Sequence, residues 1–333
     1  MRDVQGEQPP TRPTVADLSE DQLLAQVFPI LAAAGVSADV RVGPGDDAAV
    51  LGLTGPAGRL DLVATTDAMV RGSDWLDAWS SGVDVGAKVA AQNLADVAAM
   101  GARPVALLVT LVMESTTPVA WVLDLAEGLA LAARQAGCAV VGGDLSSAPE
   151  GTLVVSVTAL GSLEGRAPVL RSGARAGDVI AVAGTLGLAA AGLRLLREGR
   201  PEALPEAVAR QRRPQPPLER GPAAASAGAT SMVDLSDGLL RDAGRVARAS
   251  GVCLDLAAAT LAPDVERLAP ALGDAGARDC VLAGGEEHSL LATFPPGTPL
   301  PDGFRLLGRV VTGAGVTLDG IPQEARGWDH FAG

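Results

Sequence analysis

Several side chains that commonly build enzyme sites are scarce in this chain of 333 residues. It contains no tyrosine, two histidines (His288 and His330) and a single lysine, Lys88. Two histidines are too few for a His-ligated metal site, and nothing around them supports a catalytic triad. The three cysteines are far apart and form no CxxC motif, which argues against a zinc site or a disulfide framework. We therefore expect a reduced, cytoplasmic protein.

Long apolar runs and an excess of positive charge are absent too. No run approaches the roughly 18 apolar residues that a membrane span needs, so we expect no contact with a membrane. The first residues lack the apolar core of a signal peptide. The formal net charge of −13 argues against nucleic-acid binding, which requires a basic face. With 48% hydrophobic and 20% charged residues, the composition is that of a globular protein.

The common nucleotide-binding loops are missing as well. No GxxxxGK[ST] motif surrounds Lys88, which excludes a P-loop protein. No GxGxxG motif follows a predicted strand and opens a helix, which disfavours a Rossmann dehydrogenase. Any nucleotide must therefore be bound in another way.

The hydrophobic pattern mixes strands and helices throughout, which predicts two α/β domains. Ser19 and Gln22 form a capping box that opens a helix reaching about residue 34. Strands are expected at 48–53, 59–70, 105–113 (buried), 139–141, 152–160, 179–183, 232–234 and 252–256, and in the stretch 281–294. Helices are expected at 83–100, 118–135, within 188–210, 217–228 and 238–249. We expect a disordered arm (1–15), an N-terminal domain (16–165) and a C-terminal domain (166–333), divided within the Gly- and Pro-containing stretch 161–177.

The informative feature is a recurrence of aspartates in glycine-rich turns beside strongly apolar stretches. They are Asp46, Asp47, Asp67, Asp96, Asp144, Asp234 and Asp237. One such aspartate alone is usually a turn residue or a helix cap. Several carboxylates that converge repel one another unless cations neutralise them, and Mg²⁺ prefers such oxygen ligands. The pattern therefore indicates a Mg²⁺-dependent phosphoryl-transfer site.

Polar residues on the predicted helix 83–100 allow two interpretations. Lys88, Gln92 and Asp96 follow one another at steps of four and share a face, to which Asn93 is adjacent. They form either a solvated stripe or a polar part of a packed helix, and the surrounding alanines favour the packed helix. We interpret His288 simply as a polar residue beside Glu286 and Glu287.

In their order along the chain, the motifs resemble those of thiamine-monophosphate kinases. They are GDDAAV (45–50), TTD (65–67), QNLADVAAMGA (92–102), VGGD (141–144), RSGARAGD (171–178), DLSDGL (234–239), GGE (284–286) and GWDHF (327–331). Each motif is weakly specific, but the ordered series is highly specific and extends from about residue 20 to 333. The wider superfamily, with aminoimidazole ribonucleotide synthetase and selenophosphate synthetase, shares the aspartate-rich ATP site but not the complete set.

The resemblance implies the two-domain α/β fold of this superfamily, with an N-terminal domain that binds ATP and Mg²⁺ and forms a homodimer through sheet edges. It also implies Mg²⁺-dependent transfer of the ATP γ-phosphoryl group to thiamine monophosphate. The implied metal ligands are Asp47, Thr65, Thr66, Asp67, Asp96, Asp144, Asp234 and Asp237. The implied ATP contacts are Gly143, Asp144, Arg171 and Ser236. The implied acceptor contacts are Asp74, Glu286 and Trp328. We expect Asp67, Asp96 and Arg171 to matter most for catalysis.

Three positions depart from the family pattern. Asp74 stands where the family commonly has His, Glu287-His288 replaces an Asp-Tyr pair, and Ala126 stands where a Tyr often contacts adenine. We expect Arg71 to screen the charge of Asp74. Two alternatives remain open, namely another ATP-using enzyme of the superfamily with a small phosphorylated acceptor, and a nucleotide-binding pseudoenzyme. A selenophosphate synthetase would need a reactive cysteine near the N-terminus, and none precedes Cys138.

Overall fold

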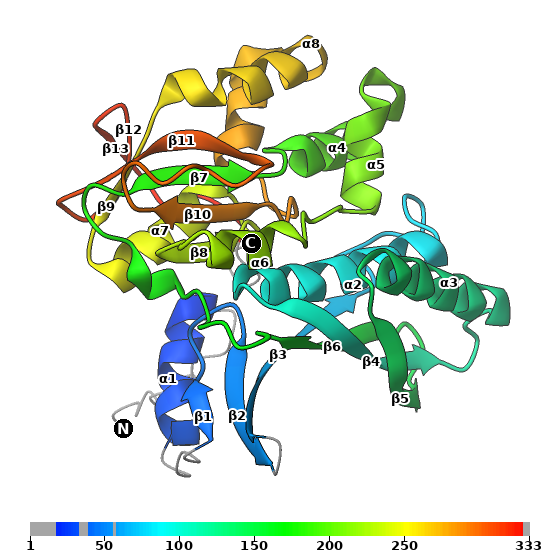
Figure 1. Ribbon diagram of the computed structural model, residues 1–333. Coiled ribbons are helices and arrows are strands. Elements are labelled where there is room, and N and C mark those ends of the chain that lie inside the picture. Colours follow the sequence, from blue (N-terminus) through cyan, green and yellow to red (C-terminus); the bar gives the residue numbers. More distant parts are fainter. Residues whose placement is uncertain (1–17, 33–38, 56–57, 329–333) are drawn as a thin grey trace, which may run out of the picture. The chain divides into compact units, whose positions relative to one another are not determined.

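The computed structural model describes residues 18–32, 39–55 and 58–328 (Figure 1). The chain divides into two compact units, of which the first includes helix α1 (Glu20–Ala32) and the second includes residues 39–328. The Ser19 N–H donates to Gln22 Oε1 at 2.9 Å, and the Gln22 N–H donates to Ser19 Oγ at 3.3 Å. The predicted capping box is therefore present. The predicted disordered arm and the expected helix end near residue 34 lie outside the described residues.

The first sheet of the larger unit is mixed (Figure 1). Its strands, in spatial order, are β1 (Val40–Val42), β2 (Ala49–Gly55), β3 (Gly58–Val70), β6 (Leu153–Ser162), β4 (Arg103–Glu114) and β5 (Ala139–Ala148). Neighbouring strands are antiparallel except β4 and β5, which run parallel. Buried and half-buried residues alternate along β6, as expected for a sheet covered on one face.

Helices α2 (Gly82–Ala99) and α3 (Val119–Gln135) pack on this sheet and on each other. A capping box of Ser81 and Asp84 begins α2 at the predicted place. A Cβ atom at Gly86 would overlap the backbone carbonyl of Leu125, so only glycine permits this close helix approach. The alanine-rich α2 is almost wholly buried, which confirms the packed-helix interpretation and rules out a solvated stripe.

The second sheet is also mixed, and helices pack on both of its faces. Its strands, in spatial order, are β13 (Ile321–Gln323), β12 (Gly315–Leu318), β9 (Cys253–Leu256), β11 (Phe304–Val311), β7 (Val179–Ala183), β10 (Leu290–Phe294) and β8 (Ser231–Asp234). The helices are α4 (Leu188–Arg197), α5 (Pro205–Arg212), α6 (Arg220–Ser226), α7 (Leu239–Ser250) and α8 (Ala258–Ala283). The predicted mixed α/β architecture is confirmed.

Helix α2 joins the two sheets, and this junction positions the candidate site. Residues of β7 that face one side, such as Ile180, pack with α4, α7 and α8. Residues that face the other side, such as Ala181, pack with Ala224 of α6 and with Ala98 and Ala99 of α2. Because α2 also contacts β3 and β6, its polar side chains lie where both sheets meet.

Two expectations about secondary structure were wrong, and one helix was missed. The strand β4 is not buried throughout, because its residues alternate between the helix-covered face and an open face where Leu108 is exposed. The strand β5 continues seven residues beyond 141, to Ala148. Helix α8 was not predicted, because Pro263, Pro270 and the positive φ of Gly273 interrupt its helical pattern.

Candidate active site

Three aspartates from distant parts of the chain meet at the junction. Asp47 precedes β2, Asp96 lies on α2, and Asp234 ends β8. Each offers a carboxylate oxygen, and the three oxygens lie within 4.8 Å of one another. Asp47 and Asp234 are buried and Asp96 is half-buried. We call this group the aspartate cluster.

The electrostatics of the aspartate cluster favour a bound cation. Burial raises the pKa of Asp47 to about 8, since the lowering by Arg171 does not offset burial and the repulsion from Asp234. Burial, Asp234 and Asp67 likewise raise the pKa of Asp96 well above its ordinary value. Asp47 Oδ2 is buried without a hydrogen-bond partner in the described residues. A divalent cation would satisfy this oxygen and remove the repulsion, so the residues fit Mg²⁺.

Strand β3 directs two predicted ligands toward α2 and one away from it. Thr65 Oγ1 donates to Asp96 Oδ2 at 2.9 Å, and the Asp67 N–H donates to the buried Asn93 Oδ1 at 2.9 Å. Thr66, one position out of phase, is exposed and accepts from Thr158 Oγ1 at 3.1 Å. The structure therefore brings Thr65 and Asp67 beside the aspartate cluster and leaves Thr66 on the opposite face.

Asp144 does not join the aspartate cluster. The interpretation that all the aspartates lie in turns at strand ends was wrong, because Asp144 lies within β5 and Asp67 within β3. Strands β6 and β4 separate β5 from β3 in the sheet. The Asp144 carboxylate is exposed and accepts from Ser146 Oγ at 2.7 Å. A short sequence motif could not reveal this separation, because it depends on strand order.

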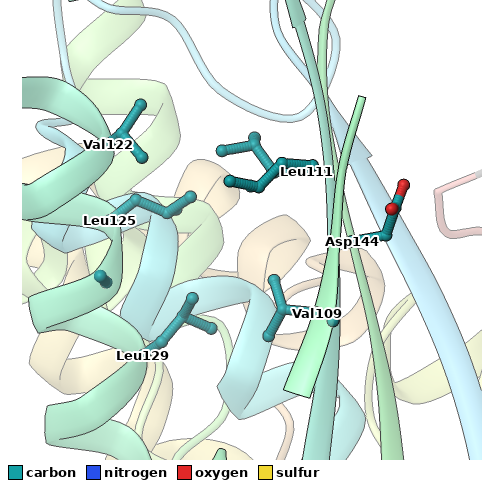
Figure 2. Close-up of a pocket in the computed structure, with 9 residues that line it drawn as sticks. Val109, Leu111, Val122, Leu125, Leu129 and Asp144 are labelled. Atoms are coloured by element: carbon teal, nitrogen blue, oxygen red, sulfur yellow. The ribbon is translucent and has the colours of Figure 1, made fainter. Parts of the chain in front are cut away.

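A pocket of about 340 Å³ opens between α3 and the strands β4 and β5 (Figure 2). Figure 2 shows the Asp144 carboxylate pointing away from this pocket, on the other side of the strand. A Cβ atom at Gly143 would overlap the carbonyl of Val109, so glycine is required for the close approach of β5 to β4. The lining is otherwise apolar and consists of Val109, Leu111, Val122, Leu125, Ala126, Leu129 and Leu145.

The turn after β8 holds Ser236 and Asp237 by backbone hydrogen bonds. Asp242 Oδ2 accepts from the N–H groups of Asp237 and Gly238, each at 3.0 Å. The carboxylate of Asp237 forms an ion pair with Arg245 at 2.6 Å and is not one of the three carboxylates of the aspartate cluster. The carbonyl of Ser236 accepts from the Glu286 N–H at 2.7 Å, which joins this turn to the loop before β10.

Within the described residues, the guanidinium of Arg171 is the positively charged group that contacts Asp47. Its Nε donates to Asp47 Oδ1 at 3.0 Å, and its backbone N–H donates to Asp46 Oδ2 at 3.1 Å. The guanidinium thus partly neutralises one edge of the aspartate cluster. An arginine in this position can also attract phosphate oxygens.

The predicted acceptor residues lie in different surroundings. Glu286 forms an ion pair with Lys88 at 2.6 Å. Trp328 is 47% exposed, and its backbone N–H donates to the carbonyl of Asp237 at 2.9 Å, which places Trp328 beside the turn after β8. Asp74 closes the turn after β3, where Asp74 Oδ2 accepts from the Val70 N–H at 2.6 Å.

The comparisons with known proteins identify the family of this chain. The family model described as AIR synthase related protein, N-terminal domain, matches residues 45–163. Thiamine-monophosphate kinase of Mycobacterium tuberculosis is 46% identical over 298 residues, 88% of this chain and 87% of that protein. The one of Corynebacterium glutamicum is 38% identical over 330 residues, 96% and 95% of the two chains. The chain belongs to the thiamine-monophosphate kinase family.

Solved structures of related proteins share the fold of this chain. The structure of AaThiL complexed with AMPPCP and TMP matches with a TM-score of 0.84 at 29% identity, covering 96% of this chain and 99% of that chain. HypE of E. coli, a hydrogenase maturation protein, matches with a TM-score of 0.60 at 23% identity, over 80% of this chain and 85% of its own, which shows a shared fold alone. Within the described residues, none of the helices combines the length and hydrophobicity that crossing a membrane requires.

Two of the departures from the thiamine-monophosphate kinase pattern now have structural explanations. Among the described residues no ion pair joins Arg71 to Asp74, and the guanidinium of Arg71 pairs instead with Glu114 at 2.7 Å. The interpretation of His288 as a simple polar residue was wrong, since His288 is buried with Nδ1 3.0 Å from Asp234 Oδ2. Burial disfavours the charged imidazole, but the hydrogen bond and the charge of Asp234 outweigh burial and raise the pKa of His288. The antiparallel pairing of β10 with β8 brings these residues together across 54 positions, which no local motif signals.

Proposed function

We propose that this protein transfers the γ-phosphoryl group of ATP to thiamine monophosphate, forming thiamine diphosphate and ADP in a Mg²⁺-dependent reaction. The observation that carries the proposal is the aspartate cluster, with three carboxylate oxygens within 4.8 Å and a buried oxygen without a partner. Membership of the thiamine-monophosphate kinase family supports the substrates, as does the related structure complexed with AMPPCP and TMP.

The proposed Mg²⁺ ligands fall into three groups. Asp47, Asp96 and Asp234 form the aspartate cluster, and Thr65 and Asp67 lie beside it. The other proposed ligands rest on the family resemblance, and they are Thr66, Asp144 and Asp237. When bound, Mg²⁺ would neutralise charge on the phosphate oxygens during transfer.

The proposed nucleotide contacts are Gly143, Asp144, Arg171 and Ser236. The apolar pocket beside Gly143 has a volume suited to a purine ring, and Ala126 in its wall leaves room that a larger side chain would fill. Arg171 lies beside Asp47, where its guanidinium would bind phosphate oxygens of ATP.

The reaction requires no general base from the protein. A phosphomonoester has a second pKa near 6, so the acceptor phosphate is largely ionised at neutral pH. One of its oxygens forms a bond to the γ-phosphorus while the bond to the bridging β–γ oxygen breaks, and ADP leaves with that electron pair. The protein residues contribute orientation, since Thr65 holds Asp96 and His288 holds Asp234.

The acceptor contacts proposed from the resemblance are Asp74, Glu286 and Trp328. An exposed indole such as that of Trp328 can stack on a cationic thiazolium ring. Glu286 presents a carboxylate that is one third exposed and can accept from a ring amino group.

The proposal includes a cytoplasmic homodimer with two domains, residues 16–165 and 166–333. Free cysteines in the structure support a reducing compartment. The edge strand β5 exposes Val140, Val141 and Leu145, which are 41%, 61% and 69% exposed. An apolar edge strand left open invites pairing, so β5 supports a contact between two copies.

The direct test is ADP release measured with and without thiamine monophosphate. We expect release to depend on the acceptor, to stop when a chelator removes Mg²⁺ and to resume when Mg²⁺ is restored. ADP release that ignores thiamine monophosphate, or that continues in the chelator, would contradict the proposal. A chain that binds ATP without turnover would be the pseudoenzyme considered above.

A further inference from the structure

Two helices, α2 and α5, hold the carboxylate of Glu286, which lies in the loop before β10. Lys88 of α2 places Nζ 2.6 Å from Glu286 Oε1. Gln211, at the end of α5, donates from Nε2 to Glu286 Oε2 at 2.5 Å. Each carboxylate oxygen thus receives one donor from a different helix. We call Lys88, Gln211 and Glu286 the carboxylate clamp.

Burial of the Lys88 side chain favours its ion pair with Glu286. Its side chain is 5% exposed, whereas that of Glu286 is 33% exposed. A buried ammonium group is costly unless a carboxylate pairs with it, so the ion pair restrains both partners. The exposed part of Glu286 remains accessible to a ligand.

The backbone of Glu286 is also constrained. Its φ of 62° lies in the left-handed region, which a non-glycine residue adopts only when its surroundings impose it. Its N–H donates to the carbonyl of Ser236 at 2.7 Å. The clamp and this hydrogen bond together fix the direction of the Glu286 side chain beside the turn after β8.

Gln211 leaves an acceptor unused beside the clamp. The residue is 6% exposed, and because Nε2 faces the carboxylate, Oε1 faces elsewhere. Gln211 Oε1 is buried and has no hydrogen-bond partner within the described part of the chain. A buried acceptor without a partner is destabilising, so a ligand that brings an N–H donor would relieve this penalty.

We infer that Lys88 is a positioning residue for the acceptor. It holds the Glu286 carboxylate so that its open side, together with Gln211 Oε1, receives N–H donors of an amino-substituted aromatic heterocycle, as in the pyrimidine of thiamine monophosphate. This inference rests on the proposed function. Helix α2 then carries both Asp96 of the aspartate cluster and, two turns earlier, the residue that orients the acceptor contact.

The test compares steady-state kinetics of the full-length wild type with Lys88→Met, Glu286→Gln and the double variant. Lys88→Met should lower kcat/KM for thiamine monophosphate about tenfold, with little change in KM for ATP. Lys88 acts through Glu286, so adding Lys88→Met to Glu286→Gln should produce little further loss. Gln211→Leu, which spares the ion pair, should lower kcat/KM for the acceptor in the same direction.

Two further measurements separate positioning from a purely structural role. Arg305→Met removes a cation from the ion pair with Asp264 elsewhere, and it should leave the acceptor KM unchanged. Melting temperatures identify any variant that fails to fold. The double variant lacks both charges of the ion pair, so it leaves no unpaired buried charge and can be compared with the wild type even if Lys88→Met or Glu286→Gln alone fails to fold. The inference would be overturned if the losses of kcat/KM in the two single variants added up in the double variant. It would also be overturned if Lys88→Met lowered kcat/KM equally for ATP and for thiamine monophosphate. In both cases the proposed function would stand. A wild type without thiamine monophosphate-dependent turnover would overturn the proposed function and the acceptor role together.

Discussion

At the scale of single residues, the surroundings of Asp74 differ from those of the aspartate cluster. Asp74 is half-buried and serves as the acceptor that closes the turn after β3, through the Val70 N–H. Arg71 pairs with Glu114, and within the described part of the chain no direct contact joins it to Asp74. The negative charge of Asp74 would therefore oppose an approaching phosphate, while its oxygen stabilises the turn.

Substitution can separate these two properties of Asp74. Asp74→Asn keeps a side-chain oxygen for the Val70 N–H but removes the charge, so we expect KM for thiamine monophosphate to fall by about two- to fivefold without a change in melting temperature. Asp74→Ala removes the turn hydrogen bond and should lower the melting temperature. An increase in KM for Asp74→Asn would instead mean that the charge itself contributes to acceptor binding.

The resemblance to thiamine-monophosphate kinases implied that Thr65, Asp67 and Asp96 lie close together, and the structure agrees. The sequence could not predict the partners of Lys88 or His288, because strand pairing and helix packing bring those partners from far along the chain. Nor could it show that Thr66 and Asp144 lie away from the aspartate cluster, since this depends on which face and which strand carries each residue.

At the scale of helices and strands, the sequence predicted those elements whose hydrophobic pattern is continuous, and it did not predict the extent of those that proline or glycine interrupts. The alanine-rich α2 was located to within a residue or two because its helical pattern continues without a break. The prolines in α8 imitate a loop, although tertiary packing of Leu261 and Leu268 keeps the helix together. Strand β5 was underestimated because glycines at 142 and 143 imitate a turn.

The exposed strand β5 supplies a prediction about assembly. Val141→Asp places a charge on the proposed dimer contact, so we expect sedimentation equilibrium to show the mass of one chain in place of two. Ile321→Asp is the matched control, since Ile321 is 66% exposed on β13, the edge strand of the other sheet. A wild type that sediments as a monomer, or a dimer that tolerates Val141→Asp, would contradict the proposed contact.

At the scale of the whole molecule, the two sheets meet through buried carboxylates, which makes stability depend on pH and on cations. A carboxyl group whose folded-state pKa is raised stabilises the fold at low pH and loses this contribution as pH rises through that pKa. The pKa of Asp47 is raised from 3.8 to about 8, and that of Asp96 is raised as well.

Without divalent cations, the melting temperature should therefore fall as the pH is raised from about 5 to about 8 and level off at higher pH, because Asp47 keeps its proton up to about pH 8 in the folded state but loses it near its ordinary pKa in the unfolded state. Added Mg²⁺ should reverse the fall, because it binds the ionised carboxylates of the folded state. Asp47→Asn should weaken this dependence of the melting temperature on pH, which calorimetric scans of the wild type and the variant would measure. A melting temperature that rises over this range without cations would argue against carboxylate repulsion at the junction of the sheets.

The central claim is most directly tested by chromatographic measurement of thiamine diphosphate formed from thiamine monophosphate, ATP and Mg²⁺. The wild type should form one ADP for each thiamine diphosphate. Asp96→Asn should fold, with a cooperative melting transition, and keep the hydrogen bond from Thr65, but it should lower kcat about 100-fold or more, because one charge of the aspartate cluster is lost. Undiminished product formation by Asp96→Asn, or ADP formed by the wild type without thiamine diphosphate, would contradict the account.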